Sequence, residues 1–560
     1  MTVPIEPGWL SLLPPLAAIV LALLFREVVL SLFAGVWLGA LLLSHYNPVT
    51  ATLTAIDRFV LGALADSDHI SIIVFSMALG GMVGVMNRNG GTRGVVEALR
   101  GLATTPRRGQ FLAWLAGILI FFDDYANTLI VGNTMRPVTD RLNVSREKLA
   151  YIVDSTAAPV AAIAVVSTWV GFEITLIGDA LKSAASQTTD AAIQANLLAG
   201  AENPFAVFLH SIPYLFYPIL TLIFVLMVVL TRRDFGPMLE AEVRAASGGG
   251  VIRPGAMPAA DTTSRELEPP EGVKHRWYNA AIPVLTVMAV ALGGIFYTGA
   301  KDLGPGDHTL WEIVGAADPF ASLIWASFAG SFVAIVLSIA QRILSAQEAI
   351  EAWIGGLKSM VLAIVILILA WSLGGVTEAM GTGPYLSSVL KDSLPMHLLP
   401  VIVFVVGALI SFATGTSWGT MAILFPVVVP LAVAMGAGVG FESGEGYTIL
   451  LGVISSIMAG SIFGDHCSPI SDTTVMSSMA SACDHVDHVR TQLPYATLVA
   501  VVAMAVGDVP TAFGMSPVIS LILGIGILYG ALRFFGKRVD VAAAAVPAES
   551  SVTAVTASAD

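Results

Sequence analysis

Aspartates stand in polar clusters between long apolar runs, and this arrangement could bind cations and protons. Asp123 and Asp124 are adjacent, Asp154 is followed by Ser-Thr-Ala-Ala-Pro, and Asp465 and Asp472 flank a short His-Cys-Ser-Pro-Ile-Ser segment. An ionisable side chain at membrane depth is unfavourable enough that its presence indicates an ion or substrate path. A desolvated carboxyl group holds either a proton or a cation, and competition between the two produces exchange.

Hydroxyl, amide and imidazole groups accompany these carboxyl groups. Proline and glycine in the same clusters leave backbone carbonyls unpaired, so hard oxygen ligands suited to Na+ are concentrated there. The candidate ion- or substrate-binding residues are Asp123, Asp124, Asn127, Thr128, Asp154, Ser155, Thr156, Thr414, Thr416, Ser417, Asp465, His466, Ser468, Ser471, Asp472 and Thr473. Asp465, Asp472 and Asp154 are the hypothesised Na+ ligands, and no cofactor is expected beyond the transported Na+ and H+.

Each cluster also has a structural interpretation. Asp123 and Asp124 fit a solvated hairpin turn, and Asp154 fits a helix cap close to the cytoplasmic surface. His466 fits a proton relay and a hydrogen-bonded structural histidine equally well.

Two glutamates and one acidic segment fall outside the hypothesised site. Glu173 is expected at the outer surface, and a role for Glu378 stays open. The segment 484–488 contains two aspartates and two histidines, but its place at the cytoplasmic interface favours a solvated turn.

The elements that carry these clusters must cross a membrane. The chain of 560 residues is 56% hydrophobic and 12% charged, with a mean hydropathy of +0.81. A soluble protein of this composition could not cover itself with polar surface. Charge-poor runs of about 20 residues recur along the chain, and this length crosses about 30 Å of hydrocarbon. The alternation of apolar and polar residues that is typical of an outer-membrane barrel is not seen. The sequence predicts an all-α membrane protein.

Basic segments predict the orientation. Five arginines lie in 88–108, two more are Arg232 and Arg233, and Lys537 and Arg538 follow near the end of the chain. Because such segments favour the cytoplasmic side, we expect a multi-pass protein of the inner (cytoplasmic) membrane with a periplasmic N-terminus and a cytoplasmic C-terminus.

The two halves of the chain resemble each other. Leu79-Gly80-Gly81 corresponds to Leu373-Gly374-Gly375, and further matches keep the same order. We expect two inverted-topology repeats, each with about five transmembrane helices plus a re-entrant hairpin, and about 11 membrane crossings in total. The hairpin tips fall at 123–128 and 414–420, and broken helices at matching points of two repeats are typical of transporter binding sites.

This pattern divides the chain into five parts. They are a first repeat over 1–233, a flexible cytoplasmic linker over 234–276, a second repeat over 277–510, an additional C-terminal transmembrane helix over 511–538, and a disordered cytoplasmic tail over 539–560.

Three motifs resemble the NhaC family of Na+/H+ antiporters. They are the run Gly464-Asp465-His466-Cys467-Ser468-Pro469-Ile470-Ser471-Asp472-Thr473-Thr474 with the following 487–495, the segment 121–127, and the segment 414–420. The resemblance implies membership of the wider ion-transporter superfamily, an elevator-like motion of a transport domain, and a homodimeric scaffold. The family also includes exchangers of small organic anions such as malate and lactate.

The function expected is therefore secondary active transport. The first hypothesis is a Na+/H+ antiporter, and the alternative is a Na+- or H+-coupled carrier or exchanger of a small organic solute, an amino acid or a carboxylate. An enzyme is not expected, because the Gly-x-Gly-Asp signature of intramembrane aspartyl proteases is broken at Ile462-Phe463-Gly464-Asp465. Nothing resembles a channel filter, and no nucleic-acid partner is expected.

Overall fold

The computed structural model describes most of the chain between residues 8 and 540. Residues 26–27, 259–268, 270–272, 307, 309–312, 314–315, 383–384, 386–388, 390–393, 437–443 and 470 lie outside the description, as do 1–7 and 541–560. The predicted tail therefore falls almost wholly outside the described residues.

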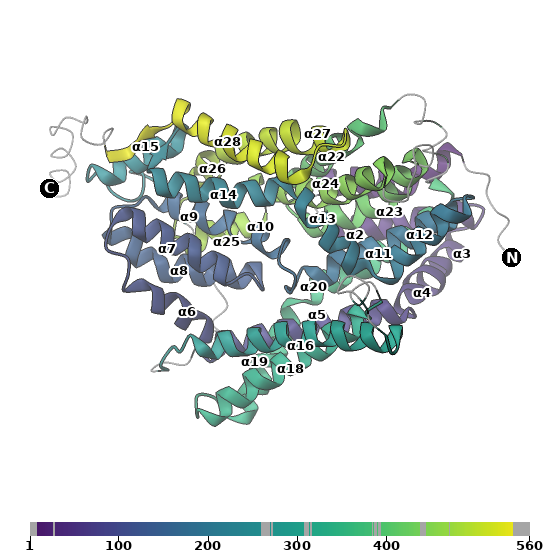
Figure 1. The fold of residues 1–560 in the computed structure, drawn as a ribbon, viewed down its shortest axis with the longest axis horizontal. Helices are drawn as coiled ribbons and strands as arrows, with labels where there is room; N and C mark the ends of the chain where they lie inside the picture. Colours follow the sequence, from purple (N-terminus) through teal and green to yellow (C-terminus); the bar gives the residue numbers. More distant parts are fainter. Residues whose placement is uncertain are drawn as a thin grey trace.

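The described chain is mainly helical (Figure 1). The helices of the first part are α1 Leu13–Phe25, α2 Val28–Leu43, α3 Pro48–Thr54, α4 Leu61–Leu64, α5 Ser67–Arg88, α6 Gly91–Arg100, α7 Pro106–Leu119, α8 Asp124–Arg141, α9 Arg146–Ser155, α10 Ala158–Ala161, α11 Val170–Gln187, α12 Ala191–Glu202, α13 Pro204–Ser211, α14 Phe216–Thr231 and α15 Gly236–Ala246. Those of the second part are α16 Tyr278–Leu303, α18 Pro319–Ala340, α19 Ala346–Ser359, α20 Val361–Ala379, α22 Leu399–Thr414, α23 Ser417–Gly436, α24 Glu445–Cys467, α25 Asp472–Ala480, α26 His485–Val502, α27 Val509–Ala512 and α28 Pro517–Phe535. The short strands β1 Arg233–Asp234 and β2 Lys537–Arg538 pair antiparallel.

Many of these helices fit a bilayer. Within the described residues, eight helices are long and apolar enough to span a membrane, or up to ten when each bent helix pair is counted as one span. The prediction of a multi-pass α-helical membrane protein is thereby confirmed, while the inverted repeats and the eleven crossings stay predictions.

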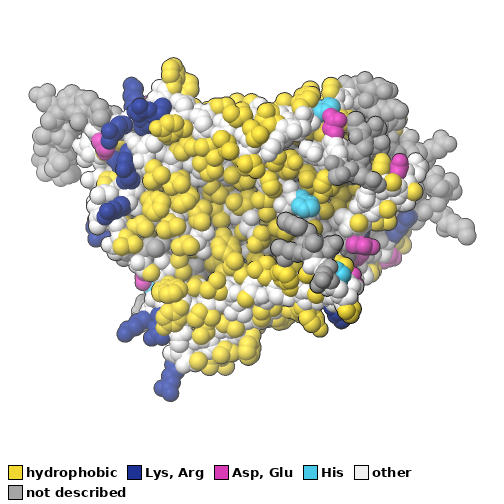
Figure 2. All heavy atoms as spheres, viewed as in Figure 1, with side chains coloured by type: hydrophobic (Ala, Val, Ile, Leu, Met, Phe, Trp, Pro, Cys, Tyr) yellow, Lys and Arg dark blue, Asp and Glu magenta, His cyan; other side chains and the backbone are white. Residues whose placement is uncertain are grey.

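Charged side chains separate along the direction of the long helices. Figure 2 shows Lys and Arg gathered at the left and most of the visible Asp, Glu and His at the right, with a wide hydrophobic band between them. Helix α5 runs along this direction, from His69 near one end to Arg88 at the other.

Small residues let buried helices approach closely. A Cβ atom on Gly460 of α24 would lie 2.4 Å from the Phe404 carbonyl oxygen of α22, and one on Gly464 would lie 2.3 Å from that of Ala408. Glycines four residues apart are a common device for close packing of membrane helices. The contact holds α24, which ends in the polar motif, against the arm α22 of the second hairpin.

Helices α5, α16, α18 and α19 form a layer of their own beside the rest of the molecule (Figure 1). Gly80 of α5 and Gly356 of α19 meet with no room for a side chain, since a Cβ on Gly356 would lie 2.2 Å from the Gly80 carbonyl oxygen. The polar clusters of the sequence lie in the other part, on helices α8, α9 and α22 to α26.

The predicted linker is folded over its described part, 234–258. Glu242 of α15 accepts hydrogen bonds from the backbone N–H and the hydroxyl of Ser145 at 2.8 Å each and from Gln110 at 3.0 Å. Asp234 forms an ion pair with the fully buried Lys148. These bonds attach the start of the segment to α7 and α9, where the sequence predicts a flexible linker, and burial raises the pKa of Glu242 above its ordinary value.

Candidate cation and proton site

The residues of the candidate site come from four places where a helix ends inside the protein. Helix α7 ends before Asp123, α9 ends at Ser155, α22 ends at a left-handed Gly415 (φ 73°), and α24 ends at Cys467 with Pro469 following. Glycine adopts that φ without strain and proline cannot continue a helix, so these residues free backbone groups inside the protein.

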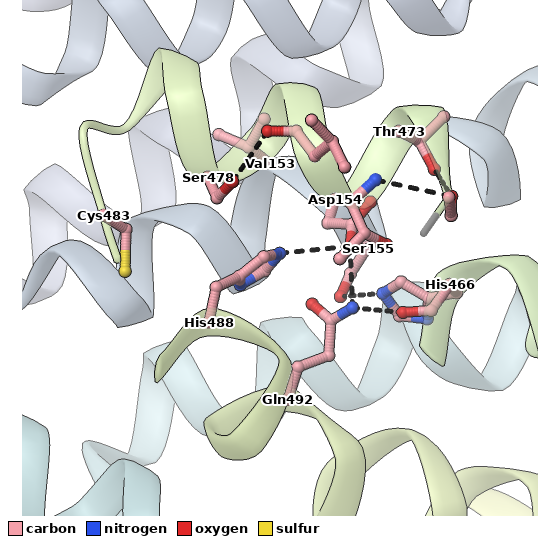
Figure 3. A network of polar contacts seen from close by, with 12 residues as sticks. Val153, Asp154, Ser155, His466, Thr473, Ser478, Cys483, His488 and Gln492 are labelled. Atoms are coloured by element: carbon pink, nitrogen blue, oxygen red, sulfur yellow. Dashed lines mark hydrogen bonds and ion pairs between the residues drawn. The ribbon is translucent and has the colours of Figure 1, made fainter. Parts of the chain in front are cut away.

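Asp154 is the centre of a buried network (Figure 3). Its carboxyl group is 1% exposed, and its Oδ2 atom accepts from the Gln492 amide at 2.7 Å and the Thr474 hydroxyl at 3.1 Å. His488 Nε2 lies 3.2 Å from the same oxygen. Helices α9, α25 and α26 therefore meet at a single carboxylate oxygen.

His466 lies next to this network and joins the two parts of the chain. Its Nε2 atom is 3.1 Å from the Ser155 hydroxyl, and its Nδ1 atom is 2.6 Å from the Tyr217 hydroxyl. Gln492 also donates to the His466 carbonyl oxygen. Both ring nitrogens thus have partners, an arrangement that serves a structural histidine and a proton relay alike.

Asp465 is bound to the tip of the second hairpin. The Ser417 hydroxyl donates to its Oδ2 atom at 2.9 Å, and the Ser468 hydroxyl donates to the carbonyl oxygen of Phe412 at 2.7 Å. The end of α24 and the turn between α22 and α23 are therefore one connected unit.

The tip of the first hairpin is buried as well. Asp123 and Asp124 are 4% and 2% exposed, so the solvated turn considered for them is wrong. The Asn127 amide donates to the carbonyl oxygens of Gly117 and Thr156, each at 2.7 Å. These bonds attach the hairpin to the interruption after α9.

Several buried side-chain oxygens in this region have no hydrogen-bond partner among the described residues, and three of them belong to residues that form or adjoin the network. They are Oδ1 of Asp154, Oδ1 of Asn127 and Oε1 of Gln492. No group of three or more His, Cys, Asp and Glu side chains within the described residues could hold a metal ion. The Asp154 carboxylate and the neutral oxygens of Asn127 and Gln492 are hard donors of the kind that Na+ accepts.

The structure does not bring all the predicted residues to the network. The hydroxyls of Thr128, Thr156 and Thr414 donate to carbonyl oxygens of their own helices. Thr416 accepts from the Gly419 N–H, and Ser471 caps α25 while lying 3.0 Å from the Thr473 hydroxyl. The side chain of Asp472, one of the hypothesised Na+ ligands, lies outside the described residues.

One partner of Asp154, His488, comes from the segment 484–488, which the sequence predicts to be a solvated turn, and another, Gln492, lies one helical turn further along α26. Asp484 caps α26 and Asp487 pairs with Arg253, as a surface turn would, but His488 is fully buried. His488 and Gln492 are four residues apart and share one face of α26. The four-residue spacing of these polar residues at the start of an apolar helix is the sequence signal that could have identified them as partners of a buried group.

Asp154 and Glu173 also differ from their expected surroundings. Asp154 lies within the last turn of α9 and is not a surface cap. Glu173, expected at the outer surface, is fully buried in α11.

Comparison with known proteins decides the family. The model of the Na+/H+ antiporter family matches residues 160–507. The chain belongs to the Na+/H+ antiporter family. This membership confirms the predicted family, and the match includes the motifs at 414–420 and 464–474. Proteins of this family are transporters and not enzymes.

Individual proteins are also similar to the chain. An uncharacterized protein of Haemophilus influenzae is 36% identical over 512 residues, covering 90% of this chain and 91% of that protein. The malate-2H+/Na+-lactate antiporter of Bacillus subtilis is 29% identical over 245 residues, covering 41% of this chain and 45% of that protein. The YdaH transporter of Alcanivorax borkumensis has a similar fold, with a TM-score of 0.54 at 15% identity over 83% of this chain and 90% of that one.

Proposed function

We propose that this secondary antiporter exchanges Na+ for H+ at a site centred on Asp154. One observation carries the proposal: a carboxyl group only 1% exposed has three donors on one oxygen and no partner on the other among the described residues. The free oxygen can accept a proton or a cation, but not both.

The surroundings favour a cation such as Na+ at this oxygen. Unpaired oxygens of Asn127 and Gln492 and the carbonyls freed at the helix ends are hard, neutral ligands. Asp465 belongs to the same machinery through the Thr474 hydroxyl, which lies 3.4 Å from the Asp465 carbonyl oxygen and also donates to Asp154. The second hairpin can therefore respond to the occupancy of Asp154.

Alternating access follows from an elevator-like motion in this proposal. The unit that carries the hairpins and broken helices would move against the layer formed by α5, α16, α18 and α19. That layer exposes large apolar side chains, among them Leu285, Phe296, Trp325 and Phe332, which suit contact with lipid or with the scaffold of a second copy in a homodimer.

The orientation proposed is that of the sequence prediction. The basic end of the molecule, with Arg88 and the β1–β2 pair, would face the cytoplasm of a cell with an inner membrane, and the end with His69 would face the periplasm.

Transport by purified protein in liposomes tests the exchange. We expect Na+ pulses outside vesicles to drive protons outward, and Asp154→Asn to lower this flux at least tenfold. Asp190→Asn is the matched control, because Asp190 caps the exposed start of α12 and asparagine caps equally well. Proton movement in Asp154→Asn at the wild-type rate would refute the site.

A small organic solute is the second candidate cargo. The relative named as a malate-2H+/Na+-lactate antiporter supports it, since its match covers 41% of this chain. The same vesicles can be tested with malate, lactate and amino acids. Proton flux that appears only with a solute would favour this function over Na+/H+ exchange alone.

A further inference from the structure

Glu173 is a buried acid that the proposed Na+ site does not use. It lies in the first turn of α11, is 0% exposed, and neither carboxyl oxygen has a hydrogen-bond partner among the described residues. An unpaired carboxylate in such surroundings is strongly unfavourable, so the group is neutral and carries a proton in this conformation.

The start of α11 is attached to the second hairpin by aromatic packing. The rings of Trp169 and Phe172 lie 5.3 and 4.3 Å from the ring of Trp418, measured between centroids. Trp418 follows Ser417, which binds Asp465. A change at Asp465 that moves this tip therefore changes the packing next to Glu173.

A cavity begins one helical turn away from Glu173. It has a volume of about 200 Å³ and is lined by residues that include Leu176, Asp179 and Ala180 of α11, His69 of α5 and Glu378 of α20. Leu176 and Ala180 follow Glu173 by three and seven residues, so they lie on its face of the helix, and Leu176 is only about 4.5 Å further along the axis.

The cavity is polar at its far end and lies away from the basic end of the molecule. His69 pairs with Asp179 at 2.8 Å and stacks on Trp371 at 3.8 Å between centroids. Lys182 and Glu378 also line it, and the Ser186 hydroxyl donates to Glu378 at 2.6 Å. None of these titratable groups is bonded to Glu173 in the described structure.

We propose that Glu173 is a second proton-carrying residue of the antiporter, which exchanges its proton with water in the cavity beside His69 and Asp179. A rearrangement of the contact between Trp418 and α11 connects Glu173 with the cavity, which begins one helical turn further along the helix. The carboxyl O–H bond then breaks and the proton passes to cavity water, leaving a carboxylate that takes its next proton when the site is open to the other side of the membrane. This inference rests on the proposed Na+/H+ exchange and adds a proton site separate from Asp154.

Three variants test the inference in liposomes and in detergent. Glu173→Gln keeps the shape of the protonated side chain but cannot release a proton, Glu173→Asp restores the acid, and Glu202→Gln makes the same change on the exposed end of α12. We expect Glu173→Gln to bind Na+ within twofold of wild type by calorimetry, yet to take up Na+ at least tenfold more slowly when a pH gradient drives uptake. Glu173→Asp should retain measurable uptake, and Glu202→Gln should match wild type.

Infrared spectroscopy reports the proton directly. The carbonyl band of a protonated carboxylic acid should be present in wild type and weaker in Glu173→Gln at neutral pH. If Glu173→Gln does not reach the membrane, Glu173→Met provides an apolar side chain of similar length for both measurements.

The outcomes separate this inference from the proposed function. Active wild type together with a Glu173→Gln variant of unchanged rate and pH dependence would overturn the role of Glu173 alone. Wild type that moves no protons with Na+ would refute the proposed function. In that case, the infrared band would still decide whether Glu173 holds a proton, and its absence would overturn the inference too.

Discussion

The two oxygens of the Asp154 carboxyl group have different surroundings. One is held by His488, Gln492 and Thr474, whereas the other has no partner in the described part of the chain. Fixed donors on one side orient the group, so that the free oxygen can bind an ion without a large rearrangement.

Gln492 is the partner whose removal is most informative at this scale. Gln492→Ala removes a donor to Asp154 and to the His466 carbonyl oxygen, and the loss of a buried hydrogen bond to a charged group is worth about 1.5–3 kcal/mol. We expect the Na+ concentration for half-maximal proton flux to rise about tenfold or more. Gln347→Ala, on the exposed side of α19, is the control. An unchanged half-maximal concentration would show that Gln492 does not support the site.

The sequence was informative about the acids and less so about their neighbours. Asp154, Asp465 and His466 were selected because polar groups beside Gly and Pro are rare in apolar runs. His488 follows a charged surface turn, and whether it points inward depends on how α26 rotates against α9. Tertiary packing decides that rotation, and a single sequence does not contain it.

The helix elements determine how close the broken ends come to one another. Gly117 of α7 lies against the end of α9, and a Cβ atom there would be 2.1 Å from Thr156 Oγ1 and 2.5 Å from its Cβ. The Asn127 amide also donates hydrogen bonds to the carbonyl oxygens of both residues. The tip of the first hairpin therefore tolerates no added volume.

Gly117→Ala tests this close approach. Overpacking of a tight contact costs about 1–3 kcal/mol, so we expect a lower melting temperature in detergent and slower exchange. Gly293→Ala in α16 has open space around the added methyl group and is the matched control. Equal stability of the two variants would contradict the packing described here.

Helix α15 provides a pH-dependent test outside the membrane spans. Burial raises the pKa of Glu242 above its ordinary value of 4.5, with Lys148 opposing and Asp234 adding to the shift. The folded state then holds a proton that the unfolded chain releases, so this contribution to stability is complete below about pH 4.5 and declines as pH rises through the raised pKa. As the pH rises over this range, the melting temperature of wild type should fall relative to that of Glu242→Gln. A difference that does not change with pH would contradict it.

The presence of α15 was not predictable from composition. Its segment follows Arg232 and Arg233 and precedes three glycines, which is typical of a linker. Its order depends on Ser145, Gln110 and Lys148, which are remote in the sequence.

The whole molecule has a basic and an acidic end, and these should face opposite sides of the membrane (Figure 2). Both native cysteines, Cys467 and Cys483, are buried, so labelling of an added cysteine has little background. Ser247→Cys, after α15, should react with a membrane-impermeant maleimide only in inverted vesicles, and Glu202→Cys, at the end of α12, should react in intact spheroplasts. The reverse pattern would overturn the orientation.

The gross architecture follows from composition more directly than its details do. Apolar runs of sufficient length predict the membrane helices. The number of crossings depends on how bent helix pairs are counted, such as Pro204–Tyr214 and Phe216–Thr231, which are bent by 49° relative to each other. Pro213 lies in the break between α13 and α14, and a bend of this kind does not change the hydropathy of the run.

The central claim is that Na+ and a proton exclude each other at Asp154, and the dependence of Na+ affinity on pH tests it most directly. In calorimetric titrations of purified protein, mutual exclusion predicts that the apparent Kd for Na+ rises about tenfold for each unit of falling pH where one proton replaces one ion. Asp154→Asn should abolish this dependence together with most of the binding. Tight Na+ binding that is independent of pH in wild type would contradict the account.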